Sequence, residues 1–316
     1  MIVSKRQGTK RYASLLLSLV LIFSLSGLVH PGEVEAASSK YKKFFDISKK
    51  GAPIPGYSGT KEWIPQGLAL VPSKNWIIIS HYWGNKDSNQ ASSISITSSK
   101  TSKRIKTLYL YESGSKKHTG HVGGLAVSKK HLWVASGKNV YKIPLSTISS
   151  KKDYSNIVMT PYALGHKASY ATYSDGILWI GEYMDGEDQG GKQCAPGPKG
   201  KLRGYPLTSS DGFPSNRKAT YTWSTPDRIQ GAVVTKSRVV YSQSCGRNNA
   251  SKLLIYTRGT SGKAAATPLT MPPMSENIAM RGNDLYVLFE SGARKYRNGA
   301  MPLKHLYIVN AKKLKL

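Results

Sequence analysis

A repeated pattern of short apolar segments runs through the chain, and its period is that of β-strands rather than helices. Each copy has a small or polar opening, an apolar strand, a turn rich in Ser, Lys, Gly, Asn or Asp, and a second apolar strand. The pattern therefore predicts pairs of strands joined by tight turns. The five clearest copies cover residues 64–80, 121–136, 168–182, 228–243 and 276–290.

Further strand-like segments follow each pair. Third strands are predicted at 93–97, 140–143, 202–205, 252–256 and 305–309. Weaker fourth strands are predicted at 104–110, 157–164, 219–223 and 265–271. If Trp76, Leu132, Leu178, Val239 and Leu285 are equivalent positions, the copies are 56, 46, 61 and 46 residues apart. Such spacings are typical of four-stranded propeller blades with loops of variable length.

The two ends of the pattern complement each other. The fifth copy lacks a fourth strand before Leu316, and residues 44–48 (FFDIS) form an unassigned strand-like segment before the first copy. An N-terminal strand that completes the last blade would close the ring. We therefore predict an all-β fold, a β-propeller of five four-stranded blades closed by an N-terminal strand, with residues 37–316 as a single domain. A β-sandwich or two small β domains are the alternatives.

The openings of the copies also resemble those of a known superfamily. They read Pro65-Gln66-Gly67-Leu68, Gly123-Gly124-Leu125 and Gln230-Gly231-Ala232. In this they are similar to the secreted lactonase- and NHL-like β-propellers, and the similarity spans nearly all of residues 37–316. The resemblance implies the fold only. The full metal-ligand set of a lactonase is not found, so no catalytic residue carries over.

The first 36 residues have the three zones of a secretory signal peptide. A basic segment from Lys5 to Arg11 precedes an apolar run at 15–29, and Val34-Glu35-Ala36 offers small residues for cleavage. The apolar run is shorter than the roughly 20 residues that cross a bilayer core. An uncleaved anchor is the alternative, and no later segment is long and apolar enough to span a membrane. We expect a secreted monomer, extracellular or associated with the cell wall.

The chain is strongly basic, with 46 Lys and Arg, 17 Asp and Glu, and a net charge of +29. Without residues 1–36, which hold four basic and two acidic side chains, the net charge is +27. A basic surface favours anionic partners, such as a cell-surface polymer or an extracellular glycan. The lysines occur singly or in pairs and form no basic-aromatic groove, so nucleic acid is not expected as a specific partner.

The two cysteines form an even pair in an exported chain. Neither Cys194 nor Cys245 has the spacing of a redox or zinc motif, so a disulfide is predicted. Both fall in loops after second strands, in the third and fourth copies. The bridge would hold the long loop at 183–202 over one face of the ring, and a loop of this length is more often functional or disordered than inert. Tethering by a bridge favours the functional interpretation.

Strand geometry gathers one set of polar residues at that face. In an antiparallel pair the start of the first strand lies beside the end of the second, so all five blades present these two points around the mouth of the ring. The following residues are predicted to bind a ligand there: Gln66, His81, His121, Glu182, Gln230, Gln243, Glu276, Asn277 and Glu290. In the alternative interpretation they only satisfy buried backbone groups.

Two kinds of chemistry fit the acidic members. Calcium takes several oxygen ligands, and the candidates for a calcium site are Glu182, Asp185, Asp188 and Glu276. Two of Glu182, Glu276 and Glu290 could instead serve as general acid and base on a glycosidic bond, which depends on their separation. A nucleophile elbow, a phosphate-binding loop and a dinucleotide fingerprint are all missing.

Three functions are therefore open. The first is a secreted propeller that binds an anionic polymer or glycan at its mouth. The second is a calcium-assisted polysaccharide hydrolase or lyase, and the third is a scaffold for another protein. Whether the chain is an enzyme is not decided by its sequence.

Overall fold

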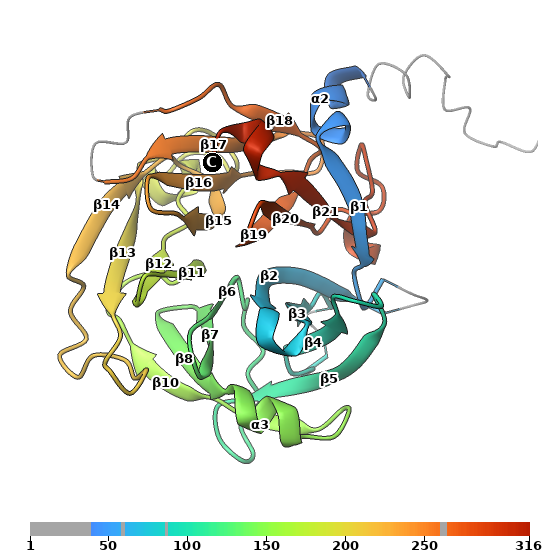
Figure 1. Ribbon diagram of the computed structural model, residues 1–316. Helices are drawn as coiled ribbons and strands as arrows, with labels where there is room; N and C mark the ends of the chain where they lie inside the picture. The colour runs from blue at the N-terminus through green and yellow to red at the C-terminus, as the bar shows by residue number, and fades with distance from the viewer. Residues whose placement is uncertain (1–38, 58–60, 86–87, 260–263) are drawn as a thin grey trace, which may run out of the picture. The chain divides into compact units, whose positions relative to one another are not determined.

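Five sheets, antiparallel except for one short edge strand, follow one another in a ring in the described part of the computed structural model of the protein (Figure 1). The structure describes residues 39–57, 61–85, 88–259 and 264–316, and Lys40–Leu316 form one compact unit. The innermost strand of each sheet contacts that of the next, and the last contacts the first. The ring is therefore closed. The expected signal peptide at 1–36 lies outside the described residues.

Each sheet is one blade, numbered here in chain order. Blade 1 contains β2 (Trp63–Val71), β3 (Trp76–Trp83), β4 (Ser93–Ser98) and β5 (Arg104–Tyr111). Blade 2 contains β6 (Gly124–Val127), β7 (His131–Ser136), β8 (Asn139–Pro144) and β10 (Thr160–Ala163). Blade 3 contains β11 (Tyr170–Ser174), β12 (Ile177–Gly181), β13 (Gly200–Pro206) and β14 (Tyr221–Thr225). Blade 4 contains β15 (Ile229–Val234), β16 (Arg238–Gln243), β17 (Ser251–Thr257) and β18 (Leu269–Met271). Blade 5 contains β19 (Ser275–Arg281), β20 (Asp284–Phe289), β21 (His305–Asn310) and β1 (Ser48–Pro53).

The core lies between the blades, because each blade buries both of its faces. In β3, Ile78 packs in the cluster shared by blades 1 and 2, whereas Ile77 and Ile79 pack against Leu288 of blade 5. Successive side chains of a strand point to opposite faces, so a strand covered on both faces reads as a continuous apolar run. The second strand of each copy has this character for that reason.

The glycines of the strand openings allow the inner strands to approach one another. A Cβ atom on Gly124 would lie 2.2 Å from the backbone nitrogen of Ala171, and one on Gly231 would lie 2.6 Å from the Cα atom of Asn277. In both cases the obstructing atom is backbone of the next blade, so no side chain could give way. Glycine marks a close approach of two strands here.

The prediction of five blades closed by an N-terminal strand is confirmed, but the closing strand is β1 at Ser48–Pro53 and not the segment at 44–48. β1 pairs with β21 from Ser48 onward. The predicted segment at 44–48 was placed too early, because Phe44 belongs to the short helix α2 (Lys42–Asp46). Its buried ring packs edge-on against Phe289, with centroids 5.9 Å apart, so Phe44 is apolar because it joins the core and not because it pairs in the sheet.

The predicted fourth strand at 157–164 is two strands that belong to different blades. β9 (Asn156–Val158) pairs in parallel with β5 and gives blade 1 a fifth strand, whereas β10 pairs with β8 of blade 2. Met159, between them, is buried in the core of blades 1 and 2. The helix α3 (Leu145–Ser150) precedes this crossing and buries Leu145 and Ile148. Among the described residues, no helix is long and apolar enough to cross a membrane.

Candidate functional site

A β-bulge at the start of the inner strand turns polar side chains toward the mouth of the ring. In blade 1, Gln66 and Gly67 together oppose Ser80, because the pairing shifts by one residue there. The same shift occurs at Gln230 in blade 4 and at Glu276 in blade 5. A bulge changes the direction of a side chain, and bulges are common beside functional sites.

These strand openings line one cavity of about 660 Å³, which we call the mouth cavity. Each blade contributes one residue from the opening of its inner strand: Gln66, Gly123, Ser169, Gln230 and Glu276. The walls carry Glu290, His121 and three tyrosines, Tyr82, Tyr183 and Tyr296. Three cationic side chains also line it: Lys167, Arg247 and Lys295.

Two carboxyl groups meet in this cavity. Glu276 is only 3% exposed and donates a hydrogen bond to Glu290, which also accepts one from Gln66 Nε2 at 3.0 Å. Burial raises the pKa of both groups, that of Glu290 to about 8, and the charge of Glu290 raises the pKa of Glu276 further. Two ionised carboxylates cannot donate to each other, so the pair keeps at least one proton at neutral pH.

Aromatic side chains surround the pair. The hydroxyls of Tyr82 and Tyr296 are 3.3 Å apart, and the ring of His121 stacks on Tyr82 with centroids 4.0 Å apart. Burial and the nearby Glu290 carboxyl raise the pKa of Tyr296 to about 12, so its hydroxyl stays neutral. The cavity therefore offers hydrogen-bond donors and acceptors together with flat apolar faces.

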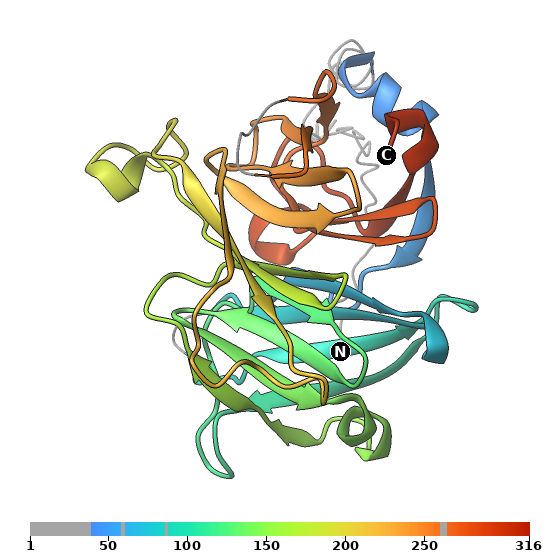
Figure 2. The same cartoon turned by 60° about the vertical axis from the view of Figure 1, so that its left-hand side comes forward.

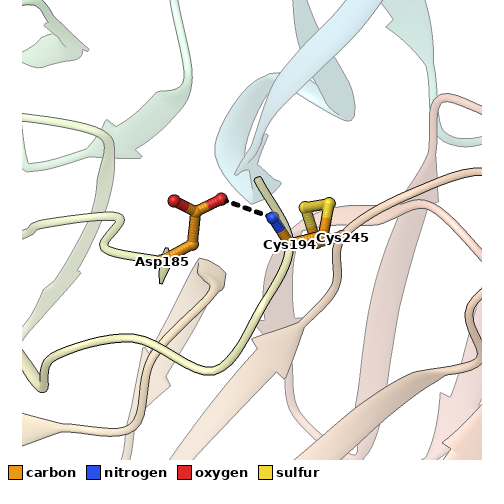
Figure 3. Close-up of side chains that lie close together, drawn as sticks. All are labelled: Asp185, Cys194 and Cys245. Carbon is orange, nitrogen blue, oxygen red and sulfur yellow. Dashed lines mark hydrogen bonds between the residues drawn. A yellow bond between two sulfur atoms is a disulfide. The ribbon is translucent and has the colours of Figure 1, made fainter. Parts of the chain in front are cut away.

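The predicted disulfide forms one edge of the cavity. Cys194 and Cys245 join the loops that follow β12 and β16, in blades 3 and 4 (Figure 3). The Asp185 carboxylate accepts hydrogen bonds from the backbone N–H groups of Cys194 and Glu187, at 2.9 and 3.0 Å, which fixes the loop locally. This loop contains the single turn η2 (Gly186–Gln189), and in Figure 2 its yellow-green segment projects from the blades. Cys194 itself lines the mouth cavity.

Four residues predicted for the mouth do not line it. His81 Nε2 lies 3.0 Å from the carbonyl oxygen of Pro55, and burial lowers the pKa of His81 to about 4. Glu182 accepts a hydrogen bond from Arg203 at 2.6 Å. Gln243 Nε2 donates to Asp227, and Asn277 is fully buried beside Gly231.

At three of these positions the difference between the predicted and the observed lining residue has the same cause. The residue that lines the cavity is the next one along the chain: Tyr82, Tyr183 and Ser244 instead of His81, Glu182 and Gln243. Because side chains alternate along a strand, an error of one residue selects the opposite face. The structure does bring Gln66, His121, Gln230, Glu276 and Glu290 together at the cavity.

The four candidates for calcium ligands are each engaged elsewhere. Glu182 is paired with Arg203, and Asp188 with Lys167. Asp185 accepts hydrogen bonds from backbone N–H groups, and Glu276 is hydrogen-bonded to Glu290. In the part of the chain that the structure describes, one set of three potential ligand atoms lies close together, from Asp185, Cys194 and Cys245. Its two sulfur atoms form the disulfide. The described residues therefore do not gather these four carboxylates around one point, and calcium binding stays a prediction.

Sequence reasoning missed the residues of the cavity that come from irregular segments. Lys295 and Tyr296 belong to the turn η3 (Arg294–Tyr296) between β20 and β21, and Arg247 follows the disulfide. The signal available was the concentration of basic residues in 294–297, directly after Glu290. Strand patterns give no position for such side chains.

No protein-family model and no curated protein matches the sequence. Solved structures with a similar fold include the glutaminyl cyclase of Myxococcus xanthus, at 10% identity, covering 83% of this chain and 94% of that one with a TM-score of 0.49. Another is the PQQ-bound aldose sugar dehydrogenase of Streptomyces coelicolor, at 13% identity, covering 83% and 96% with a TM-score of 0.49. Similarity at this level carries no argument about function. The assignment as a β-propeller rests on the five sheets described above.

Proposed function

We propose that the protein is a secreted β-propeller that binds an anionic glycan in the mouth cavity. The observation that carries the proposal is the hydrogen-bonded pair Glu276–Glu290 in a cavity that three cationic side chains also line. A signal-peptide pattern and a disulfide both fit a protein that works in an oxidising compartment outside the cytoplasm.

The charge of the cavity favours an anion. Because Glu276 and Glu290 keep at least one proton between them, they contribute at most one negative charge at neutral pH. The charges of Lys295 and Arg247 act directly on Glu290 and lower its pKa against the effect of burial. Arg247 donates a hydrogen bond to the neutral amide of Asn298 at 2.8 Å. Two cations thus face at most one carboxylate, and a bound anion would neutralise the excess positive charge of the cavity.

The hydrogen-bonding groups favour a ligand rich in hydroxyls. Gln66, Gln230, Ser169 and the tyrosine hydroxyls can both donate and accept, as can a protonated carboxyl. A cavity of about 660 Å³ is in the range that holds small ligands. One or two units of an acidic sugar chain would combine these requirements, with the rest of the polymer over the basic surface.

The test is binding of a galacturonate tetramer to the mature protein, compared with an uncharged galactose tetramer, by titration calorimetry. Lys295→Ala should weaken binding of the acidic tetramer by about tenfold, equivalent to ~1.4 kcal/mol. Lys100→Ala removes the same charge from an exposed turn between β4 and β5 and should change the affinity less than about twofold. Binding should also weaken as salt is added.

Two results would contradict the proposal. One is binding that is unchanged in both Lys295→Ala and Gln66→Ala, which would place the ligand elsewhere. The other is equal affinity for the acidic and the uncharged tetramer, which would remove the electrostatic argument.

A second candidate, a glycan lyase, is favoured by the raised pKa of Glu290. A base with a pKa of about 8 is suited to proton abstraction at neutral pH, and Tyr82 and Tyr296 lie beside it. Hydrolysis by this pair is less well supported, because glycosidase carboxyls stand about 5 Å or more apart and these two are hydrogen-bonded to each other. The appearance of an unsaturated uronate product, lost in Glu290→Gln, would distinguish a lyase from a binder.

A further inference from the structure

A second cavity, of about 720 Å³, lies where blade 1 faces β1 and the start of β21 in blade 5. We call it the blade groove. It is separate from the mouth cavity, and β3 divides the two: His81 lines the groove and the next residue, Tyr82, lines the mouth cavity. We infer that the blade groove is a binding site for a saccharide chain, in addition to the site proposed at the mouth.

The sequence of β4 creates the groove. Its side chains alternate between two faces: Ile94 and Ile96 pack in the core of blades 1 and 2, whereas Ser93, Ser95 and Thr97 line the groove. The third strands of blades 4 and 5 carry bulky residues on both faces: Leu253, Leu254, Ile255 and Tyr256 in β17, and Leu306, Tyr307, Ile308 and Val309 in β21. Small polar residues thus stand where close packing needs large apolar ones. The resulting space is a property of the strand and not of a loop.

Four aromatic rings run along this hollow, each in contact with the next. Trp83 meets Trp63 edge-on at 4.8 Å, Trp63 stacks with Tyr109 at 6.3 Å, and Tyr109 lies 6.4 Å from Tyr154, all between ring centroids. The first three side chains are half-buried, and Tyr154 is 53% exposed. A row of rings open to solvent provides consecutive flat surfaces for a chain-like ligand.

The exposed member of the row is held in position. Tyr154 has a φ of +59°, a left-handed conformation that bulky residues rarely adopt. Its N–H donates to the Thr107 carbonyl oxygen at 2.7 Å and to Asp153 at 3.0 Å. Asp153 also accepts two hydrogen bonds of 2.8 Å from Arg104, whose guanidinium lies 5.0 Å from the Tyr154 ring. Strain of this kind persists where surrounding contacts enforce it, and functional sites are common locations.

Three buried polar atoms without a partner lie on the same walls. Among the described side chains, eight polar atoms are buried with no hydrogen-bond partner, and three of them, His81 Nδ1, Trp83 Nε1 and Thr97 Oγ1, belong to residues that line the groove. Buried polar atoms nearly always have partners, so three unpartnered atoms around one cavity favour a bound molecule that supplies them. After a small movement of the lining side chains, the hydroxyl groups of a bound ligand could supply these hydrogen-bond partners.

The chemistry of the lining identifies the ligand class. A sugar ring has an apolar C–H face that stacks on aromatic rings and an edge of hydroxyls that matches Ser93, Ser95 and Thr97. The described lining residues include Lys61 and Lys304 and no Asp or Glu, so any charged substituent would be anionic. An aromatic peptide could use the rings but would leave the hydroxyl floor unmatched.

The experiment is a titration of the mature protein with tetramers of β-1,4-glucose, N-acetylglucosamine and galacturonate, followed by calorimetry and tryptophan fluorescence. At least one tetramer should bind and change the fluorescence. Tyr154→Ala should weaken binding about tenfold. Thr97→Val keeps the shape of the side chain, so it should leave the thermal unfolding unchanged and weaken binding severalfold.

Two controls separate the groove from other sites. Tyr221→Ala removes another exposed tyrosine, which is 41% exposed, lies in β14 and lines neither cavity, so it should not change the saccharide affinity. Gln66→Ala alters the mouth cavity and should leave groove binding intact, so the two proposals can fail independently. The inference is overturned if no tetramer binds at millimolar concentration. Saccharide affinity that stays at the wild-type value in both Tyr154→Ala and Thr97→Val would overturn it as well. So would binding of a tryptophan-rich peptide in the groove with no binding of any saccharide.

Discussion

The carboxyl pair in the mouth cavity should make the protein less stable as the pH rises through neutrality. Unfolded glutamates lose their protons near pH 4.3, whereas the folded pair keeps at least one up to about pH 8. Between these values the folded state binds more protons than the unfolded state, so its stability decreases with increasing pH. One such proton corresponds to about 1.36 kcal/mol per pH unit.

At lower pH the histidines make stability rise with pH, which is opposite to the effect of the carboxyl pair. They therefore determine the pH above which the decrease in stability can be seen. Burial lowers the pKa of His81 to about 4, and it also lowers the pKa values of His166 and His305. The unfolded state therefore takes up these protons first, and stability rises with pH until about 6.5. Above that value only the carboxyl pair remains, and stability should fall by about 2 kcal/mol between pH 6.5 and 8.

The assay is urea unfolding at pH steps from 5 to 9, with the disulfide intact and tryptophan fluorescence as the signal. In the double variant Glu276→Gln and Glu290→Gln both titrating carboxyls are absent, so the decline above pH 6.5 should shrink to less than half. Glu187→Gln makes the same chemical change on an exposed side chain and should follow the wild-type curve. Stability that is flat or rising from pH 6.5 to 8 in the wild type would refute the reasoning. An undiminished decline in the double variant would do the same.

Three further outcomes are expected. Replacing both Cys194 and Cys245 by Ser should lower the free energy of unfolding by about 4 kcal/mol, because the bridge spans 51 residues, and equal unfolding curves would argue against it. Asp211→Ala should cost about 2–4 kcal/mol in urea unfolding, since the buried carboxylate accepts hydrogen bonds from Ser128 and His131, and a loss below 1 kcal/mol would contradict this role. Gly124→Ala should prevent normal folding, as judged by near-ultraviolet circular dichroism, because its Cβ atom would lie 2.2 Å from the next strand; a native spectrum would show that the strands can separate.

The blades could be predicted because burial on both faces leaves a direct record in the sequence. Second strands such as β3, with Ile77, Ile78 and Ile79 in succession, are readable without any knowledge of partners. The closing strand was harder to place. Phe44 is an apolar residue of a kind common in strands, yet it lies in a helix and packs against Phe289 and Tyr307, which are far along the chain.

The mouth could be predicted as a location but not side chain by side chain. Glu276 and Glu290 belong to adjacent strand ends of one blade, and the structure places both in the cavity. Glu182 and Tyr183 directly follow the end of β12. Beyond the end of a strand the alternation of apolar and polar residues no longer indicates which side chain points into the cavity, so the sequence did not favour Tyr183 over Glu182. The groove left a clearer signal, since the Ser-Ile-Ser-Ile-Thr sequence of β4 pairs a buried apolar face with a small polar one.

Closure of the ring by β1 also governs when the molecule can fold. Ser48 pairs with Val309, so a strand that is synthesised before the other four blades must wait for one that is synthesised after them. Blades 3 and 4 are built from contiguous segments, and blades 1 and 2 exchange only the neighbouring strands β9 and β10, so these four blades can form their hairpins as the chain emerges. Blade 5 cannot. Contacts of such long sequence separation slow folding, and the unpaired edge of β21 stays available for wrong partners until β1 arrives. The final kinetic step is therefore the docking of one strand, and crowding of newly made chains should be most harmful just before it.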